Sequence, residues 1–125
     1  PGMALKIVTW NVLADCYSYG LEKDQECKRI HHLSWDRWHL IQHILTTCDA
    51  DVICLQEVDH YDDYYSPFFH KLNYISIYLP RPHREDGCLI AFKPSKLQLQ
   101  EKIDIQFDDL IHHFQLSSSI QHKYM

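Results

Sequence analysis

The stretch Asp51-Val52-Ile53-Cys54-Leu55-Gln56-Glu57 decides the fold class of this chain. Its centre, Val52 to Leu55, is a short apolar run with a charged residue before it and polar residues after it. A run of this length predicts a strand that is buried on both faces, as in a sheet covered by helices. Such a strand requires helices and further strands on either side of it in the sequence.

The N-terminal side supplies one strand and one helix. Residues 5–12 are rich in β-branched and aromatic side chains, which predicts a strand. Ser34 is a good N-cap for the helix that follows it. The apolar residues of that helix fall at spacings of three and four and form one stripe, made of Trp38, Ile41, Leu45 and Cys48.

The C-terminal side supplies a second helix and three strands. Pro67 after Ser66 predicts a helix over residues 67–72. Strands are predicted over residues 74–79 and 88–92, and Asp86-Gly87 predicts the turn between them. Residues 97–107 alternate apolar and polar side chains, apart from Glu101, and predict a half-exposed strand or a hairpin bent near Glu101. This order of elements predicts an α/β fold with helices packed on one face of a sheet.

Composition narrows the class of protein. The chain has 125 residues, a hydrophobic fraction of 46% and a net charge of −5, with 12 basic and 17 acidic side chains. The hydrophobic fraction excludes a disordered chain, and the acidic balance argues against a protein that wraps nucleic acid with a basic face. No apolar run is long enough to span a bilayer, and no secretory signal is evident. Five cysteines without a repeating spacing favour reduced thiols inside the cell, in the cytoplasm or alternatively the nucleus.

Two polar residues follow the first two predicted strands. Asn11 ends the first, and Glu57 follows the second by two residues. In layered α/β proteins, polar side chains at the carboxyl ends of neighbouring strands collect in one crevice. A carboxylate and a carboxamide are hard oxygen ligands that suit Mg²⁺. The simpler alternative is that Asn11 caps a turn and Glu57 begins a solvated loop.

Three segments carry a resemblance to a known family: KIVTWNVLAD at residues 6–15, DVICLQEVDHY at residues 51–61 and DGCLIAF at residues 86–92. Together they resemble the endonuclease/exonuclease/phosphatase superfamily. The resemblance is nearest to its deadenylase branch, which contains the carbon catabolite repressor deadenylases, nocturnin and the Angel proteins. The continuation of Leu-Gln-Glu into Val58-Asp59-His60-Tyr61 is particular to this branch.

The resemblance implies a fold, a site and an activity. The fold is a four-layer α-β-β-α sandwich, of which this chain would be the N-terminal half, one mixed sheet with helices on one face. Glu57 would bind Mg²⁺, or Mn²⁺, and Asn11 would lie beside the metal and help to hold it or the scissile phosphate. The activity would be hydrolysis of RNA, typically poly(A), from the 3′ end. Asp86 and Gly87 match a motif near the active face, but a tight turn explains them equally well.

Two motifs of such a domain are missing. Its second half supplies an Asp-x-Asn pair and a late Asp-His pair, and this sequence has neither at the required place. We therefore assign no catalytic role to His112, His113 or His122. We expect residues 4–108 to form the N-terminal half of the domain and residues 109–125 to be a divergent tail, produced by truncation or splicing. The chain alone is then expected to be inactive, and to self-associate or to require the missing C-terminal half.

Two alternatives stay open for the function. The chain is a non-catalytic truncated isoform that acts as a binding module, or it belongs to another phosphodiesterase or phosphatase of the superfamily. The extension Val58 to Tyr61 argues against the second alternative.

One basic cluster is a weak candidate for substrate binding. Arg81, His83 and Arg84, with Lys93 and Lys96 close in sequence, would steer an RNA backbone toward Glu57. The simpler alternative is a solvated hairpin tip.

Three further groups have a simpler structural explanation. His39 and His43 are four residues apart on the predicted helix, but no third metal ligand is near in sequence. The spacing of Cys16, Cys27, His31 and His32 matches no compact zinc site. Tyr61, Tyr64 and Tyr65 would stack on bases or, more simply, pack against the sheet.

Overall fold

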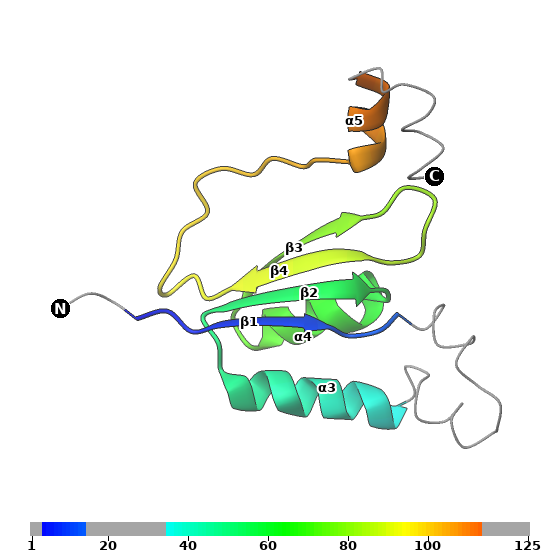
Figure 1. Ribbon diagram of the computed structural model, residues 1–125. Coiled ribbons are helices and arrows are strands. Elements are labelled where there is room, and N and C mark those ends of the chain that lie inside the picture. Colours follow the sequence, from blue (N-terminus) through cyan, green and yellow to red (C-terminus); the bar gives the residue numbers. More distant parts are fainter. Residues whose placement is uncertain (1–3, 15–34, 114–125) are drawn as a thin grey trace.

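The structure, a computed structural model, describes residues 4–14 and 35–113 (Figure 1). Four strands form one mixed sheet in the order β1-β2-β4-β3. β1 (Ile7–Asn11) is parallel to β2 (Val52–Val58), whereas β4 (Gly87–Phe92) is antiparallel to both β2 and β3 (Ile75–Pro80). The predicted α/β class with one mixed sheet is confirmed.

The helices cover one face of this sheet. α3 (Trp35–Cys48) follows β1 in the described chain, and a π-helix, η2 (Tyr61–Tyr65), leads directly into α4 (Ser66–Lys71). Three residues of the stripe predicted on α3, Trp38, Ile41 and Leu45, lie in the core, which also contains inward-facing residues of η2, α4 and the strands, whereas Cys48 is only half-buried. Its largest fully buried side chains are Tyr65, Phe69, Leu45, Ile53, Leu55, Leu89 and Val58.

The opposite face of the sheet is open, which corrects the expectation of a strand buried on both faces. β2 is buried on one face only, because Ile53 and Leu55 are buried while Val52 and Cys54 on the other face are half-buried. Cys54 and Cys88 also lie on this open face. The strand register puts a row of mostly apolar side chains there, made of Ile7, Val52, Cys54, Ile75, Ile77, Leu79, Cys88 and Ile90.

The predicted strand over residues 97–107 is wrong. These residues form no ladder with β1, β2, β3 or β4, and the chain runs past the sheet into a short helix, α5 (Phe107–His113) (Figure 1). Ile103 is 71% exposed and Phe107 is 77% exposed. Alternation creates a strand only where a neighbouring strand accepts its hydrogen bonds, and among the described strands none does so.

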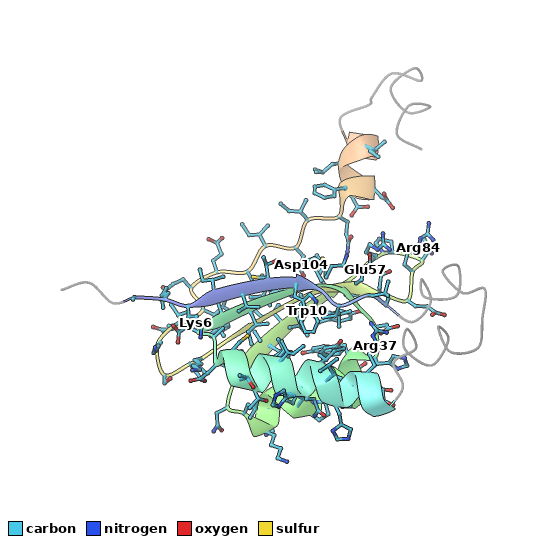
Figure 2. The ribbon with its side chains drawn as sticks, turned by 60° about the horizontal axis from the view of Figure 1, so that its bottom comes forward. Lys6, Trp10, Arg37, Glu57, Arg84 and Asp104 are labelled. Atoms are coloured by element: carbon cyan, nitrogen blue, oxygen red, sulfur yellow. The ribbon has the colours of Figure 1, made fainter. Side chains whose placement is uncertain are left out.

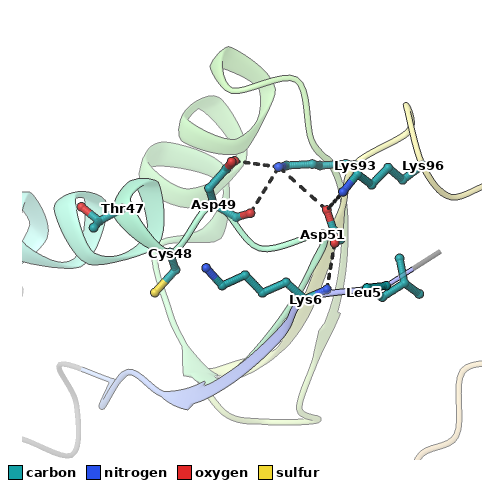
Figure 3. Close-up of a pocket in the computed structure, with 9 residues that line it drawn as sticks. Leu5, Lys6, Thr47, Cys48, Asp49, Asp51, Lys93 and Lys96 are labelled. Atoms are coloured by element: carbon teal, nitrogen blue, oxygen red, sulfur yellow. Dashed lines mark hydrogen bonds and ion pairs between the residues drawn. The ribbon is translucent and has the colours of Figure 1, made fainter. Parts of the chain in front are cut away.

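A cluster of charges fixes the end of the sheet where β1 and β2 begin (Figure 3). The carboxylate of Asp51, 3% exposed, accepts hydrogen bonds from the Lys6 backbone N–H at 2.8 Å and from Lys96 Nζ at 2.9 Å. Lys93 Nζ binds Asp49 Oδ1 at 2.6 Å. These contacts tie the starts of β1 and β2 to the chain that follows β4. The residues that make these contacts line a cavity of about 470 Å³.

Some predicted features fall outside the described residues. Ser34, Cys16, Cys27, His31, His32 and His122 belong to that group. Within residues 4–14 and 35–113, no helix has the length and apolar character needed to cross a membrane.

Candidate functional site

Asn11 and Glu57 meet at the edge of the sheet where β1 and β2 end. The two strands are parallel, and Asn11 is paired in register with Gln56. Asn11 Nδ2 donates a hydrogen bond to Glu57 Oε1 at 3.0 Å. Asn11 is exposed and Glu57, which is labelled in Figure 2, is half-buried, so the pair is open to solvent at this edge. The structure thus brings together the two residues that strand order alone had placed in one crevice.

A β-bulge gives Glu57 its direction. Leu55 pairs with Leu89 and Val58 with Gly87, so three steps along β2 match two steps along β4. The extra residue returns Val58 to the core, where it is fully buried, and turns Glu57 out of the ladder with a left-handed φ of 54°. Such a φ costs about 1–2 kcal/mol for a residue with a Cβ, and bulges that re-aim a side chain are frequent beside active sites. Nothing in the sequence marks this bulge.

The segment after β1 holds both side chains through its backbone. The Leu13 N–H donates to Asn11 Oδ1 at 3.0 Å, and the Ala14 N–H lies 3.4 Å from Glu57 Oε2. Leu13 itself has a left-handed φ of 60°. Leu13 lies two residues after β1 and Glu57 lies near the end of β2, so two non-glycine residues with this sparsely populated conformation adjoin the Asn11–Glu57 pair. The contacts from the backbone amides of Leu13 and Ala14 could not be predicted from the sequence.

Aromatic residues support the bulge from the helix side of the sheet. The Tyr78 hydroxyl donates to the Val58 carbonyl at 2.9 Å, and the Tyr61 ring stacks on the Tyr78 ring with their centroids 4.5 Å apart. Burial, followed by the nearby Asp86 and Asp59 carboxylates, raises the pKa of Tyr78 to about 12. Tyr78 therefore remains a neutral donor to the bulge through the physiological pH range.

The three tyrosines considered for base stacking are engaged within the fold. Tyr65 is buried, and Tyr64 packs against Trp38 with ring centroids 5.3 Å apart. Tyr61 also shares a hydrogen bond with Ser76 Oγ at 2.8 Å. The packing alternative therefore holds for all three.

The β3–β4 loop lies at the same edge as Glu57. Because Gly87 at the start of β4 pairs with Val58, residues 81–86 adjoin the end of β2. Arg81 Nη2 binds the buried Asp86 carboxylate at 2.8 Å, so part of its guanidinium is engaged there, while His83 and Arg84 are exposed (Figure 2). Lys93 and Lys96, which we grouped with this loop, instead lie at the opposite end of the sheet, beside Asp49 and Asp51.

Asp86 and Gly87 serve the hairpin, although not as a simple turn. Asp86 is the buried partner of Arg81, and Gly87 already belongs to β4. A Cβ on Gly87 would lie 2.3 Å from the Leu79 carbonyl oxygen and 2.8 Å from Tyr78 Cε2. The glycine is required by the close approach of β3 rather than by a left-handed turn.

The donor set of the edge suits a hard divalent cation. Glu57 offers an anionic carboxylate, and Mg²⁺ commonly takes one or two protein carboxylates and completes its shell with water and substrate phosphate. Asn11 Nδ2 donates to that carboxylate, so Asn11 would act on a bound ion through Glu57. The described residues contain no group of three His, Cys, Asp or Glu side chains arranged as a metal site, and the His39–His43 pair gains no third ligand among them. Among the described residues, Glu57 is the carboxylate that we identify for an ion at this edge, and water and substrate phosphate would complete the shell of that ion.

Comparison with known proteins identifies the family. Residues 8–120 match the endonuclease/exonuclease/phosphatase family. The chain belongs to this family. Its relatives include carbon catabolite repressor protein 4 homolog 4 of Arabidopsis thaliana, 35% identical over 88% of this chain and 27% of the relative. The CCR4-Not complex 3′-5′-exoribonuclease subunit Ccr4 of Yarrowia lipolytica is 35% identical over 50% of this chain and 11% of its own length.

Solved structures agree with the family. The crystal structure of ANGEL2, a 2′,3′-cyclic phosphatase, superposes with a TM-score of 0.69 at 31% identity, over 78% of this chain and 29% of that one. The human nocturnin catalytic domain superposes with a TM-score of 0.54 at 30% identity, over 73% of this chain and 33% of that one. The resemblance to the CCR4, nocturnin and Angel branch is confirmed. The chain spans about a third or less of these endonuclease/exonuclease/phosphatase proteins.

Proposed function

We propose that this chain supplies the metal-binding half of a Mg²⁺-dependent phosphodiesterase site that acts on the 3′ end of RNA, poly(A) in particular. One observation carries the proposal: Asn11 and Glu57, from two different strand ends, meet in a 3.0 Å hydrogen bond at an open edge of the sheet. The name of the Yarrowia relative, a 3′-5′-exoribonuclease subunit, supports the direction of attack.

At this edge, Glu57 would bind the ion and the neighbouring groups would orient its carboxylate. A bound divalent ion would polarise a phosphoryl oxygen and stabilise the leaving oxygen. Glu57 presents one carboxylate for that ion, and Mn²⁺ would fit the same donor. Asn11 and the amides of Leu13 and Ala14 keep the carboxylate facing the edge. Arg84 and His83 add positive or polar side chains on the adjoining loop, where they would contact the RNA backbone.

The isolated 125-residue chain should bind the ion without efficient turnover. A phosphodiesterase also needs a group that activates the attacking water, and we assign that role to none of the described residues, which also contain no group of three His, Cys, Asp or Glu side chains that could hold a metal ion. We therefore propose that residues 4–108 are the N-terminal part of the domain, and that activity requires a C-terminal part. The free thiols of Cys48, Cys54 and Cys88 fit a reducing compartment, for which we propose the cytoplasm.

Hydrolysis of a 2′,3′-cyclic phosphate is a second candidate. It is favoured by the likeness to ANGEL2, which has also been solved in complex with adenosine-2′,3′-vanadate. Both candidates use the same metal edge and differ in the phosphate that is attacked.

The test uses the protein as it occurs in its source cells, purified through a tag on its own gene. A 5′-labelled RNA that ends in adenosines is offered with a 3′ hydroxyl and, separately, with a 2′,3′-cyclic phosphate. We expect Mg²⁺-dependent stepwise shortening of the first RNA. Opening of the cyclic phosphate without shortening would favour the second candidate, and binding without any hydrolysis would favour a binding module.

The matched variants are Glu57→Gln and Glu101→Gln. Both remove one negative charge, but Glu101 is an exposed residue in the segment after β4. Glu57→Gln should lose more than about 100-fold in rate, beyond what an outer-shell partner of a metal typically contributes. Glu101→Gln should retain the rate. Full activity in Glu57→Gln would remove Glu57 from the site.

A further inference from the structure

We infer that Arg37 is a positioning residue for the Asn11–Glu57 pair, which it holds through the two peptide groups between Val12 and Ala14. The inference rests on the proposed function in one respect only, namely that the pair binds a divalent cation. The contacts of Arg37 stand independently of that function.

Arg37 reaches the segment from the first turn of α3. Its Nη2 donates to the carbonyl oxygens of both Val12 and Leu13. The next residue, Trp38, is buried and packs edge-on against Tyr65 at 4.9 Å, so this part of the helix is anchored in the core. Arg37 and Glu57 lie at the same end of the molecule, with Arg37 on the helix side (Figure 2).

The two carbonyls belong to the same peptide groups as the two amides that hold the site. The peptide between residues 12 and 13 offers its carbonyl to Arg37 and its N–H to Asn11 Oδ1. The peptide between residues 13 and 14 offers its carbonyl to Arg37 and its N–H toward Glu57 Oε2. In a planar trans peptide the C=O and N–H bonds point in opposite directions. Arg37 and the site therefore hold opposite edges of the same two planes, and neither plane can rotate without breaking both contacts.

The same contacts explain how Leu13 keeps its left-handed φ of 60°. A cation shared by the carbonyls on either side of this residue favours the conformation in which both point the same way. It also polarises the two peptide groups, which strengthens their N–H groups as donors. A lysine offers a compact ammonium in place of the planar guanidinium and would hold the two carbonyls less rigidly.

The test compares Arg37→Met and Arg37→Lys in the full chain, with Lys96→Met as matched control. Lys96 also makes a charged contact, with Asp51, but at the opposite end of the sheet. The readouts are the NMR resonances of the Asn11 side-chain amide, hydrogen-exchange protection of the Ala14 amide, Mn²⁺ affinity by calorimetry, and Tm.

Arg37→Met should shift the Asn11 amide, abolish the protection of the Ala14 amide and weaken Mn²⁺ binding about 10- to 100-fold, as typical for an outer-shell partner. For Arg37→Lys, the Asn11 shift, the Ala14 protection and the Mn²⁺ affinity should all lie between those of Arg37→Met and those of the unmodified chain. Lys96→Met should lower Tm alone. Unchanged Asn11 and Ala14 signals in folded Arg37 variants would overturn the inference.

Two further outcomes are decided by the unmodified chain. If both Arg37 variants fail to fold, scalar couplings across the hydrogen bonds from the Arg37 guanidinium to the Val12 and Leu13 carbonyls decide, and their absence overturns the inference. If the unmodified chain binds no Mn²⁺, the proposed function fails, while the Asn11 and Ala14 signals still decide the role of Arg37.

Discussion

At the scale of single residues, the site depends on a hydrogen bond between two side chains that come from different strands. Glu57 has one oxygen facing Asn11 Nδ2 and the other facing the Ala14 amide. Each contact removes freedom from the carboxylate before any ion arrives, which lowers the entropy lost on binding. If Glu57 binds a divalent ion as proposed, Asn11 would contribute to the affinity without being required as a ligand.

Replacing Asn11 tests this directly. Asn11→Ala should reduce Mn²⁺ affinity about 10- to 100-fold, because the carboxylate of Glu57 loses its side-chain donor. Gln98→Ala removes an exposed amide from the segment after β4 and should leave the affinity unchanged. Calorimetric titration measures both. Equal affinities for the two variants would contradict the positioning role of Asn11.

The raised pKa of Tyr78 predicts that the free energy of unfolding falls at alkaline pH. Its folded pKa is raised to about 12 from 10.0, chiefly by burial, so the folded state keeps a proton that the unfolded chain loses. The contribution is complete below pH 10 and is lost as the pH rises toward 12. Denaturant unfolding across this range should show a decline that Tyr78→Phe reduces. Near neutral pH, the free energy of unfolding of Tyr78→Phe should be lower by about 1 kcal/mol, because the hydrogen bond to the Val58 carbonyl is missing.

At the scale of the elements, β2 and β4 are matched through a bulge on one strand and a glycine on the other. Val58 and Gly87 pair across the ladder directly beyond the bulge. The glycine lets β3 approach closely enough for Tyr78 to reach the Val58 carbonyl. The hairpin and the bulge are therefore one structural unit.

A methyl group at position 87 should disturb this unit. Gly87→Ala places its Cβ 2.3 Å from the Leu79 carbonyl oxygen and should cost about 1–3 kcal/mol, the usual range for overpacking. Cys88→Ala, at an exposed neighbouring position, should change stability by less than about 0.5 kcal/mol. Chemical denaturation of both variants checks the difference. A neutral Gly87→Ala would contradict the close approach of β3.

Elements with a strong local signal could be predicted from the sequence. The apolar stripe of α3 and the four strands of the sheet follow from side-chain spacing, and strand order alone puts Asn11 and Glu57 at one edge. The bulge at Glu57, the left-handed Leu13 and the reach of Arg37 could not be predicted, because they arise from backbone geometry and contacts distant in sequence. Residues 97–107 carry the alternation of a strand, but a strand also requires a partner, and spacing carries no information about that partner.

At the scale of the whole molecule, the two ends of the sheet have different roles. One end carries Asn11, Glu57 and the β3–β4 loop. The other is closed by Asp51, which lies between Lys96 and the backbone of Lys6. Between them, the open face exposes apolar side chains such as Ile90 and Ile75, at 47% and 46%. Contiguous apolar surface of this kind is unusual on a soluble monomer.

The ion pairs and hydrogen bonds of Asp51 predict that the free energy of unfolding falls at acid pH. The hydrogen bonds from the Lys6 backbone and from Lys96 lower the pKa of Asp51 below its usual 3.8. The stability it contributes is therefore present above that pH and is lost as the pH falls through the lower folded value. Denaturant unfolding below pH 4 should show this loss, and Asp51→Asn should flatten it. Asp104→Asn, in an exposed pair with Lys102, should leave the profile unchanged.

We propose above all that Glu57 holds a divalent cation at the edge where β1 and β2 end. Mn²⁺ broadens the NMR signals of nearby nuclei, so a titration of the ¹⁵N-labelled chain maps the ion directly. We predict broadening that begins at the amides of Asn11, Ala14 and Glu57 and disappears in Glu57→Gln. Broadening centred on Asp49 and Asp51 at the opposite end, or a pattern that Glu57→Gln leaves unchanged, would contradict the account.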